Sequence, residues 1–307
     1  MMSYQYWGFG LNIESEIEFP ELLPTTFNKA DVVISIGATP SKLDGENVVH
    51  KVRMSASPKE YLLDLLNVAR YYAAHGNKIV IEPYTNADNS SIRLFLLSNA
   101  MAAILHQQNK IPFHASGIIT EKGLVLFTGR SGAGKSTTAC GLMDLGYKLF
   151  TDDVCVLSHN EQTGKIEAVS SYPMMKLWEN TIDQYAPQKV KSHKLRPHLA
   201  KYGFFEHDQF TTESLPVTQV CILKPDSLVD EYASRSLTAV KAFNELQQNT
   251  YRRGQVDMMN LRQHHFGIIS RLTQQATITE ILRPQRKNNI SDFILYIQHL
   301  INANAPA

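Results

Sequence analysis

The sequence predicts an α/β fold with a mixed sheet around a phosphate-binding strand, loop and helix. Three observations predict it. Strand-like and helix-like segments alternate along the 307 residues. A continuous apolar run, Leu124 to Thr128, is typical of a strand buried on both faces, and it leads into a glycine-rich loop. That loop enters a helical segment, Lys135 to Leu145, which Gly146 would end in a left-handed conformation.

The composition describes a folded chain without a strong charge. Hydrophobic residues make up 43% and charged residues 19%, which is enough apolar material for a sizeable core. The 30 Lys and Arg residues against 29 Asp and Glu give a net charge of +1, so neither nucleic acid nor an anionic membrane is the expected partner. No apolar run approaches the roughly 20 residues of a membrane-spanning helix.

Cysteine usage and the start of the chain predict a cytoplasmic protein. Cys140, Cys155 and Cys221 are widely spaced and form neither a disulfide framework nor a metal-ligand pattern. The first residues lack the basic start and apolar run of a signal peptide.

The first third of the chain predicts short strands and two helices. Strands are expected at Tyr4 to Ile13, Val32 to Ile36 and Lys78 to Pro83, which are rich in β-branched and aromatic residues. Apolar positions at helical spacing predict helices at Tyr61 to His75 and at Arg93 to Gln108. The second helix is apolar almost all round, so we expect it to be buried.

The rest of the chain predicts a larger α/β unit. We expect residues 1 to 110 to form a smaller α/β portion packed on a catalytic domain of residues 111 to 307. Within that domain the expected strands are Tyr147 to Thr151, a hairpin of Val154 to Ser158 and Ile166 to Ser170, Val217 to Leu223 and Thr277 to Leu282. The expected helices are Ala239 to Gln248 and residues 260 to 275. We expect Tyr185 to Phe210 to be a loop or lid.

The loop from Gly129 to Ser136 fits the pattern G-x-x-x-x-G-K-[ST] at every fixed position. Its glycines let backbone N–H groups approach phosphate oxygens, and the following helix adds its positive end. Lys135 can reach the β- and γ-phosphates, while the Ser136 hydroxyl can bind Mg²⁺. The predicted nucleotide-binding residues are Gly129, Arg130, Ser131, Gly132, Ala133, Gly134, Lys135, Ser136 and Thr137.

Two adjacent carboxylates, Asp152 and Asp153, follow the next strand. A crossover helix usually returns the chain parallel to the strand before it, so both should lie at the sheet edge that carries the phosphate loop. One can hold Mg²⁺ together with Ser136, and the other can accept the proton of an attacking hydroxyl. The structural alternative is an ordinary turn between two strands.

The stretch Ile111 to Leu157, IPFHASGIITEKGLVLFTGRSGAGKSTTACGLMDLGYKLFTDDVCVL, resembles the catalytic domain of the HPr kinase/phosphorylase family. It has a histidine ahead of the loop strand, the loop itself, and an Asp-Asp pair directly after the next strand. That family is structurally akin to the ATP-dependent phosphoenolpyruvate carboxykinases. A looser similarity over most of the chain, including FGLNIESEIEFPEL and SYPMMKLWEN, is to the HPr-kinase-like proteins of gene clusters for peptide natural products such as lasso peptides.

The resemblance implies roles for three residues. Asp152 would be the catalytic base, Asp153 a Mg²⁺ partner, and His114 a group beside the reacting phosphate. From the residues alone, His114 is equally compatible with a hydrogen-bonded core histidine. The EIRGLG signature of true HPr kinases is absent, so HPr itself is not the expected substrate. Because HPr kinases assemble as hexamers, the resemblance also implies a homo-oligomer.

Several further residues have weaker signals. A basic stretch of Lys189, Lys191, Lys194 and Arg196 is expected either to close over the triphosphate or to be a solvated loop. Arg252 and Arg253 are candidates for an arginine that stabilises the transition state, with Arg253 assigned to the catalytic set. Trp178 and Tyr172 are expected to be packing residues.

These observations predict a kinase that uses ATP and Mg²⁺. The expected reaction transfers the γ-phosphate to a serine hydroxyl of a peptide or protein, with a lasso-peptide precursor as one candidate. The alternatives are a kinase for free serine or a sugar, a carboxykinase-like enzyme, and a regulator that binds nucleotide without transferring phosphate. The carboxykinase is disfavoured because no additional metal-ligand cluster is found in the sequence.

Overall fold

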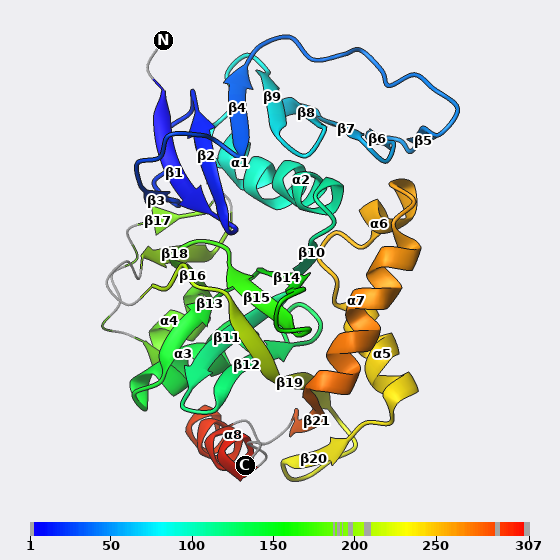
Figure 1. The fold of residues 1–307 in the computed structure, drawn as a ribbon. Helices are drawn as coiled ribbons and strands as arrows, with labels where there is room; N and C mark the ends of the chain where they lie inside the picture. The colour runs from blue at the N-terminus through cyan, green and yellow to red at the C-terminus, as the bar shows by residue number, and fades with distance from the viewer. Residues whose placement is uncertain are drawn as a thin grey trace.

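The computed structural model describes residues 3–186, 188, 191, 193–195, 199–205, 210–285 and 289–303. Two nine-stranded sheets and a small three-stranded sheet make up the molecule, with helices between and around them (Figure 1). The fold class is therefore α/β with mixed sheets, as the sequence predicts. Among the described helices, none is long and apolar enough to cross a membrane.

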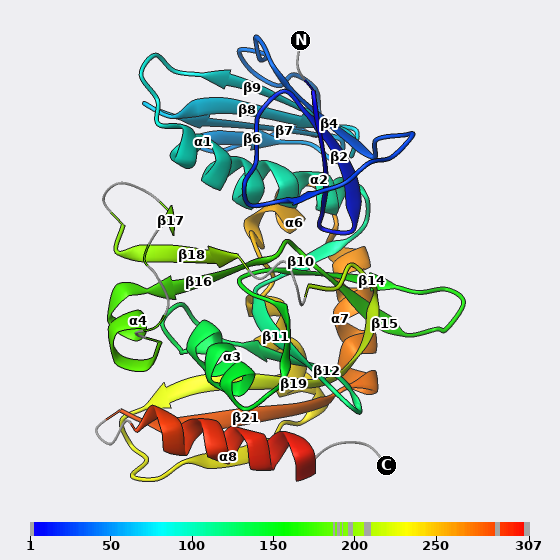
Figure 2. The same cartoon turned by 90° about the vertical axis from the view of Figure 1, so that its left-hand side faces the viewer.

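The first sheet is built from the N-terminal part of the chain, in the order β3-β1-β2-β4-β9-β8-β7-β6-β5. One face is covered by a continuous helical stretch, α1 (Asn89–Phe95), the π-helical turn η1 (Leu96–Ala100) and α2 (Met101–Gln107), as Figure 2 shows. The strands are β1 (Tyr4–Gly8), β2 (Leu11–Ser15), β3 (Leu23–Pro24), β4 (Val32–Ile36), β5 (Val49–His50), β6 (Met54–Ala56), β7 (Glu60–Leu65), β8 (Ala69–Ala74) and β9 (Lys78–Pro83).

The helix predicted at Tyr61 to His75 is wrong. These residues form the antiparallel hairpin of β7 and β8, with Asn67 at the turn in a left-handed conformation (φ 64°). Tyr61 and Tyr71 are fully buried in the core of this sheet. A short apolar run is compatible with the period of a helix or of a strand, and here these residues form strands because their apolar side chains are buried in the sheet. The predicted strands at Val32–Ile36 and Lys78–Pro83 and the buried helix after Arg93 are confirmed.

The second sheet carries the phosphate-binding unit, in the order β10-β14-β15-β19-β12-β11-β13, with β21 and β20 beyond β19. Its strands are β10 (Ile111–Phe113), β11 (Ala115–Thr120), β12 (Gly123–Thr128), β13 (Lys148–Thr151), β14 (Cys155–His159), β15 (Ile166–Ser170), β19 (Leu215–Asp226), β20 (Ala233–Ser236) and β21 (Thr277–Pro284). β12 pairs in parallel with β19 and antiparallel with β11. β13 pairs antiparallel with the far side of β11, so it runs in the same direction as β12 but one strand removed.

Helices cover both faces of this sheet. α3 (Lys135–Asp144) and α8 (Ile290–Ala303) pack on one face, and α5 (Ala239–Gln248) and α7 (Arg262–Gln275) pack on the other. Figures 1 and 2 show α8 and α7 on separate sides of the strands. The sequence named no helix after residue 282, so α8 was missed. The short helix α6 (Gly254–Met258) precedes α7.

The segment from residue 185 to 210, expected to be a loop or lid, is partly strand. β17 (His193–Lys194) and β18 (Lys201–Phe205) pair with each other, and β18 pairs with β16 (Met174–Trp178) to form the three-stranded sheet. The short helix α4 (Glu179–Tyr185) follows β16. Several residues of the segment lie outside the described part of the chain, including Lys189 and Arg196 of the basic stretch.

The two large sheets share a hydrophobic core. Val154, Val156 and Met174 from the second half pack in one buried cluster with the first sheet and its helices. The expected domain boundary near residue 110 falls between α2 and β10. The division into a smaller N-terminal portion and a catalytic domain stays a prediction.

Candidate functional site

The phosphate loop joins the end of β12 to the start of α3, as predicted. Gly129, Gly132 and Gly134 all have positive φ, at 140°, 82° and 99°. A Cβ on Gly129 would lie 2.5 Å from the carbonyl oxygen of Leu223 in β19, so this position has no room for a side chain. Glycine at these positions is therefore required by the backbone path, which turns from a buried strand into a helix within a few residues.

The Lys135 side chain is folded across its own loop. Its Nζ donates hydrogen bonds to the carbonyl oxygens of Gly129 (2.9 Å) and Arg130 (3.3 Å), and the side chain is buried. Burial lowers the pKa of Lys135, and the nearby Asp153 carboxylate only partly offsets this. A cation held in a loop of backbone N–H groups at a helix start is the arrangement that binds phosphate.

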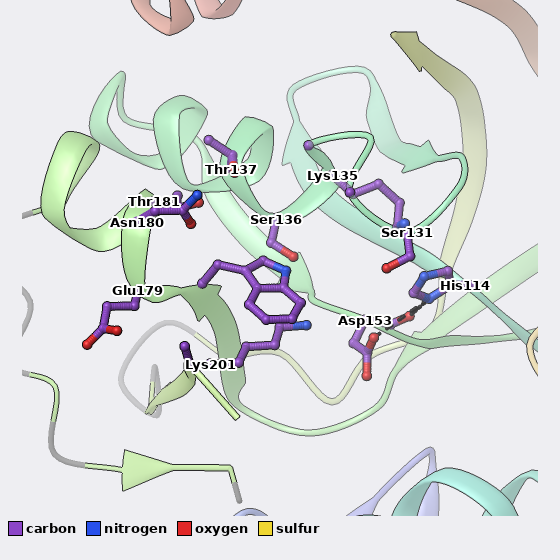
Figure 3. Close-up of a pocket in the computed structure, with 14 residues that line it drawn as sticks. His114, Ser131, Lys135, Ser136, Thr137, Asp153, Glu179, Asn180, Thr181 and Lys201 are labelled. Carbon is purple, nitrogen blue, oxygen red and sulfur yellow. Dashed lines mark hydrogen bonds and ion pairs between the residues drawn. The ribbon is translucent and has the colours of Figure 1, made fainter. Parts of the chain in front are cut away.

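A cavity of about 590 Å³ opens over this loop. Figure 3 shows Thr137, Asn180 and Thr181 at one end of it, and His114 and Asp153 at the other, with Ser136 between them. Its lining residues come from the position before β11, the loop and the start of α3, the turn after β13, and the segment around β16, α4 and β18. They are His114, Ser131, Gly132, Gly134, Lys135, Ser136, Thr137, Asp153, Trp178, Glu179, Asn180, Thr181, Ala200 and Lys201.

The two aspartates have different environments. Asp152 is 1% exposed and does not line the cavity. One of its carboxylate oxygens accepts a hydrogen bond from the Ser116 hydroxyl (2.5 Å), and the other accepts one from the backbone N–H of Lys176 (2.7 Å). Both oxygens are thus engaged inside the protein. The role of catalytic base that the resemblance implied for Asp152 stays a prediction, and its carboxylate does not line the cavity.

Asp153 does reach the cavity, because its backbone turns to φ 75° directly after the buried Asp152. Its Oδ2 accepts a hydrogen bond from the Lys176 ammonium at 2.7 Å. Burial alone would raise the pKa of Asp153, but the Lys176 ammonium, and after it His114 and Lys201, hold that pKa well below its usual range. Asp153 is therefore ionised at neutral pH.

Lys176 was not found from the sequence. It is a buried cation whose Nζ also bonds the Tyr172 hydroxyl at 2.7 Å. Burial would lower the pKa of Lys176, yet the Asp153 carboxylate raises it well above its usual value. No local sequence pattern predicts this role, because it depends on β16 lying against the turn that carries Asp152 and Asp153.

His114, just before β11, lies between the loop and the aspartates. Its Nδ1 is 2.7 Å from the backbone carbonyl oxygen of Asp153. A carbonyl can only accept, so Nδ1 carries the proton and Nε2 of the neutral ring keeps its lone pair. Burial, with a contribution from the Lys135 charge, lowers the pKa of His114. The ring is accordingly neutral at neutral pH.

Trp178 corrects another expectation. The sequence assigned it to packing, but the residue is 43% exposed and lines the cavity, with the Lys201 Nζ 5.7 Å from the centre of its ring. Tyr172, by contrast, is buried and packs as expected. Trp178 in β16 is paired with Lys201 in β18, and the sequence does not predict this pairing.

A second cavity, of about 620 Å³, adjoins the first at His114 and Ser131. Arg252 lines it, but Arg253 lines neither cavity and instead bonds the Gln247 side chain at 3.1 Å. The catalytic assignment of Arg253 therefore lacks support from its position. Of the basic stretch, Lys191 forms ion pairs with Asp183 and Glu179 and lines neither cavity.

The cavity is better suited to Mg²⁺ that is bound together with a nucleotide than to a metal ion that is bound by protein side chains alone. Within the described residues no three His, Cys, Asp or Glu side chains converge as a metal site. The Ser136 hydroxyl and the Asp153 carboxylate both line the cavity and are oxygen donors, which Mg²⁺ prefers. Mg²⁺ usually takes its other ligands from phosphate oxygens and water, so this pair fits the ion that accompanies ATP.

No protein-family model matches the chain, and no curated protein matches its sequence. Among solved structures, the chain is similar to the Hpr(Ser) kinase/phosphatase from Coxiella burnetii. The sequence identity is 15% and the TM-score is 0.32, with 62% of this chain and 88% of that chain covered. At this identity and TM-score, the match says nothing about what this chain binds or catalyses, and that question rests on the site.

Proposed function

We propose that the chain is an ATP-dependent kinase that transfers the γ-phosphate of ATP to a serine hydroxyl of a peptide or protein. One observation carries the proposal: Lys135 and Ser136 of a complete phosphate loop line the same cavity as the ionised Asp153. Phosphoryl transfer needs little covalent chemistry from the protein, so positioning and charge at such a site are what catalysis requires.

The loop would bind the triphosphate. Its backbone N–H groups face the phosphate oxygens, and Lys135 would exchange its bonds to the Gly129 and Arg130 carbonyls for the β- and γ-phosphates. Ser136 and Asp153 would hold Mg²⁺, which neutralises charge on the phosphates when bound. The buried Lys176 would keep Asp153 ionised and oriented toward the cavity.

We propose that His114 Nε2 accepts the proton of the attacking hydroxyl. The new bond joins the acceptor oxygen to the γ-phosphorus, the bond from that phosphorus to the bridging oxygen of ADP breaks, and the hydroxyl proton passes to Nε2. The assignment is supported by the tautomer that the Asp153 carbonyl enforces and by the lowered pKa of His114. Asp152 would act by holding the turn, through Ser116 and the Lys176 backbone.

The acceptor itself is proposed from chemistry alone. The adjoining cavity at His114 and Ser131 is large enough for a side chain with its flanking peptide. A lasso-peptide precursor is one candidate, and the cytoplasm is the proposed compartment. A homo-oligomer also belongs to the proposal, through the family resemblance.

The test is a transfer assay read by mass spectrometry. Purified protein is incubated with Mg-ATP and a panel of serine-containing peptides, free serine and small sugars. We expect one phosphate on a peptide, and loss of transfer with Lys135→Ala. Phosphate on free serine or a sugar alone would make the protein a small-molecule kinase. ATP binding without transfer to any acceptor would instead favour a nucleotide-binding regulator.

The same assay tests the proton acceptor. His114→Gln keeps a polar side chain but no basic nitrogen, so we expect transfer to fall by about 10²- to 10³-fold. In the unmodified protein, transfer should fall on acidification only below pH 6.5, because the pKa of His114 is lowered and protonation removes the lone pair. If Asp152→Asn abolishes transfer while His114→Gln does not, the base is Asp152.

A further inference from the structure

A third cavity, of about 320 Å³, lies along α3 and α8 and continues from the phosphate-loop cavity. The two cavities share Thr137 and Thr181 in their linings. Most of the other lining side chains are apolar, and Asp144 is the acidic residue among them. The apolar ones come from both helices: Cys140, Leu145, Ile290, Ile294 and Leu295.

Two of these apolar side chains are unusually exposed. Leu145 is 42% exposed and Leu295 is 54% exposed, although both lie beside the buried core between α3 and α8. A concave apolar site with a few polar groups is the typical setting for a flat, mostly apolar ligand. Exposed leucines at its edge would lose their contact with water once such a ligand bound.

The direction of a bound triphosphate leads to this cavity. Lys135 reaches the terminal phosphates, and His114 and Asp153 lie at that end (Figure 3). Thr137 lies at the opposite end, in the first turn of α3, where the first phosphate and the ribose would leave the loop. The nucleoside then passes Thr137 and Thr181, the two residues that both cavities share.

The length of the cavity fits a nucleoside. Its lining on α3 runs from Thr137 to Asp144, which spans about 10 Å at the rise of an α-helix. Trp178 is the other candidate surface for a stacked base, but Lys201 beside it lies close enough to Lys135 and Asp153 to shift their pKa values. Trp178 lines the phosphate-loop cavity and does not line the cavity between α3 and α8.

We propose that the cavity between α3 and α8 holds the purine of the bound nucleotide, with Asp144 accepting a hydrogen bond from the 6-amino group of adenine. This inference rests on the proposed nucleotide site. It assigns the nucleobase to a surface formed by α8, well outside the phosphate loop in sequence. It also gives a reason for ATP to be preferred over a nucleotide that lacks the amino group.

The experiment compares three ligands by titration calorimetry in the presence of Mg²⁺: ATP, inosine triphosphate and inorganic tripolyphosphate. ATP should bind at least tenfold more tightly than tripolyphosphate. Leu295→Trp, which narrows the cavity, should weaken ATP at least tenfold and leave tripolyphosphate within twofold. His299→Trp is the matched control, because His299 is exposed one turn further along α8 and does not line the cavity, so it should change neither.

Asp144→Ala provides a second variant at an exposed position that folding should tolerate. ATP should lose about tenfold in affinity, the cost of one hydrogen bond to a charged group, and inosine triphosphate should be unchanged. Equal affinity for ATP and tripolyphosphate in the unmodified protein would overturn the proposal. So would a preference for ATP that Trp178→Ala removes and Leu295→Trp does not. If neither ATP nor tripolyphosphate binds, the nucleotide site itself is wrong.

Discussion

The two walls of the cavity, the phosphate loop and the aspartate turn, are built in opposite ways. The loop wall, Gly129 to Ser136, acts through its backbone: its glycines have positive φ angles, and at Gly129 the approach of β19 also excludes a side chain. The turn wall, Asp152 and Asp153, acts through side chains, and one residue points into the core while the next faces the cavity. A site formed by the backbone can be predicted from its residue types. A site formed by side chains also depends on which other elements pack around them.

The largest effect should come from the buried cation of the turn wall. Lys176→Met leaves the Asp153 carboxylate without its partner, and breaking a buried pair from one side costs about 3–5 kcal/mol of unfolding free energy. Denaturant unfolding at neutral pH measures it. Lys191→Met is the control, because Lys191 pairs with the more exposed Asp183, and this variant should be far less destabilised than Lys176→Met. Equal losses in both variants would remove the special role of Lys176.

The loop wall should respond to shape and not to charge. Gly129→Ala places a Cβ 2.5 Å from the Leu223 carbonyl oxygen, so we expect about 2–3 kcal/mol of destabilisation and a loss of ATP binding. Gly132→Ala has open space around its Cβ and should show only the cost of its positive φ, about 1 kcal/mol. Thermal unfolding and ATP titration compare the two. A Gly132 variant as damaged as the Gly129 variant would contradict this account.

Asp152 should behave as part of the core. Asp152→Ala leaves the Ser116 hydroxyl and the Lys176 backbone N–H without their acceptor, at a cost of about 1–3 kcal/mol. Urea unfolding measures this loss. The destabilised protein should still transfer phosphate at a temperature where it is folded.

The last effect concerns the pH dependence of stability, and it separates the turn wall from the rest of the core. His106 is fully buried in α2, and desolvation lowers its pKa to about 3. Between pH 6.5 and 3 the unfolded chain binds a proton there that the folded chain does not, so stability falls as the pH falls through this window. The slope is up to about 1.4 kcal/mol per pH unit.

His106→Phe should reduce the slope of the curve between pH 6.5 and 5, measured by urea unfolding at several pH values. The Asp153 pair should act in a different window. Its carboxyl pKa is lowered on folding, so its contribution is complete above the unfolded pKa of about 3.9 and is lost only below it. An unchanged slope in the His106 variant would mean that other groups bind the protons.

The sequence predicts the loop wall well and the turn wall poorly. The strand before Gly129, the helix after it and the left-handed Gly146 follow from local patterns, and the structure confirms each. The position of β13 parallel to β12 also follows from the crossover, although β11 between them does not. Which aspartate faces the cavity is decided by Lys176 and Ser116, residues from other strands, and no local pattern holds that information.

The errors elsewhere have the same cause. The hairpin of β7 and β8 was mistaken for a helix because the spacing of its apolar residues fits both a helix and a strand, and only pairing in the sheet distinguishes them. Trp178 was assigned to packing because its exposure depends on β18, which lies in a segment expected to be loop. In each case contacts distant in sequence determined the outcome.

The two neighbouring aspartates have separate tasks in this site, and a pair of variants distinguishes them. Asp152→Asn and Asp153→Asn are assayed for phosphate transfer from Mg-ATP, each under conditions where unfolding shows the variant to be folded. We expect at least a hundredfold loss of transfer for Asp153→Asn and less than tenfold for Asp152→Asn. The reverse order, with transfer abolished by Asp152→Asn alone, would contradict this expectation.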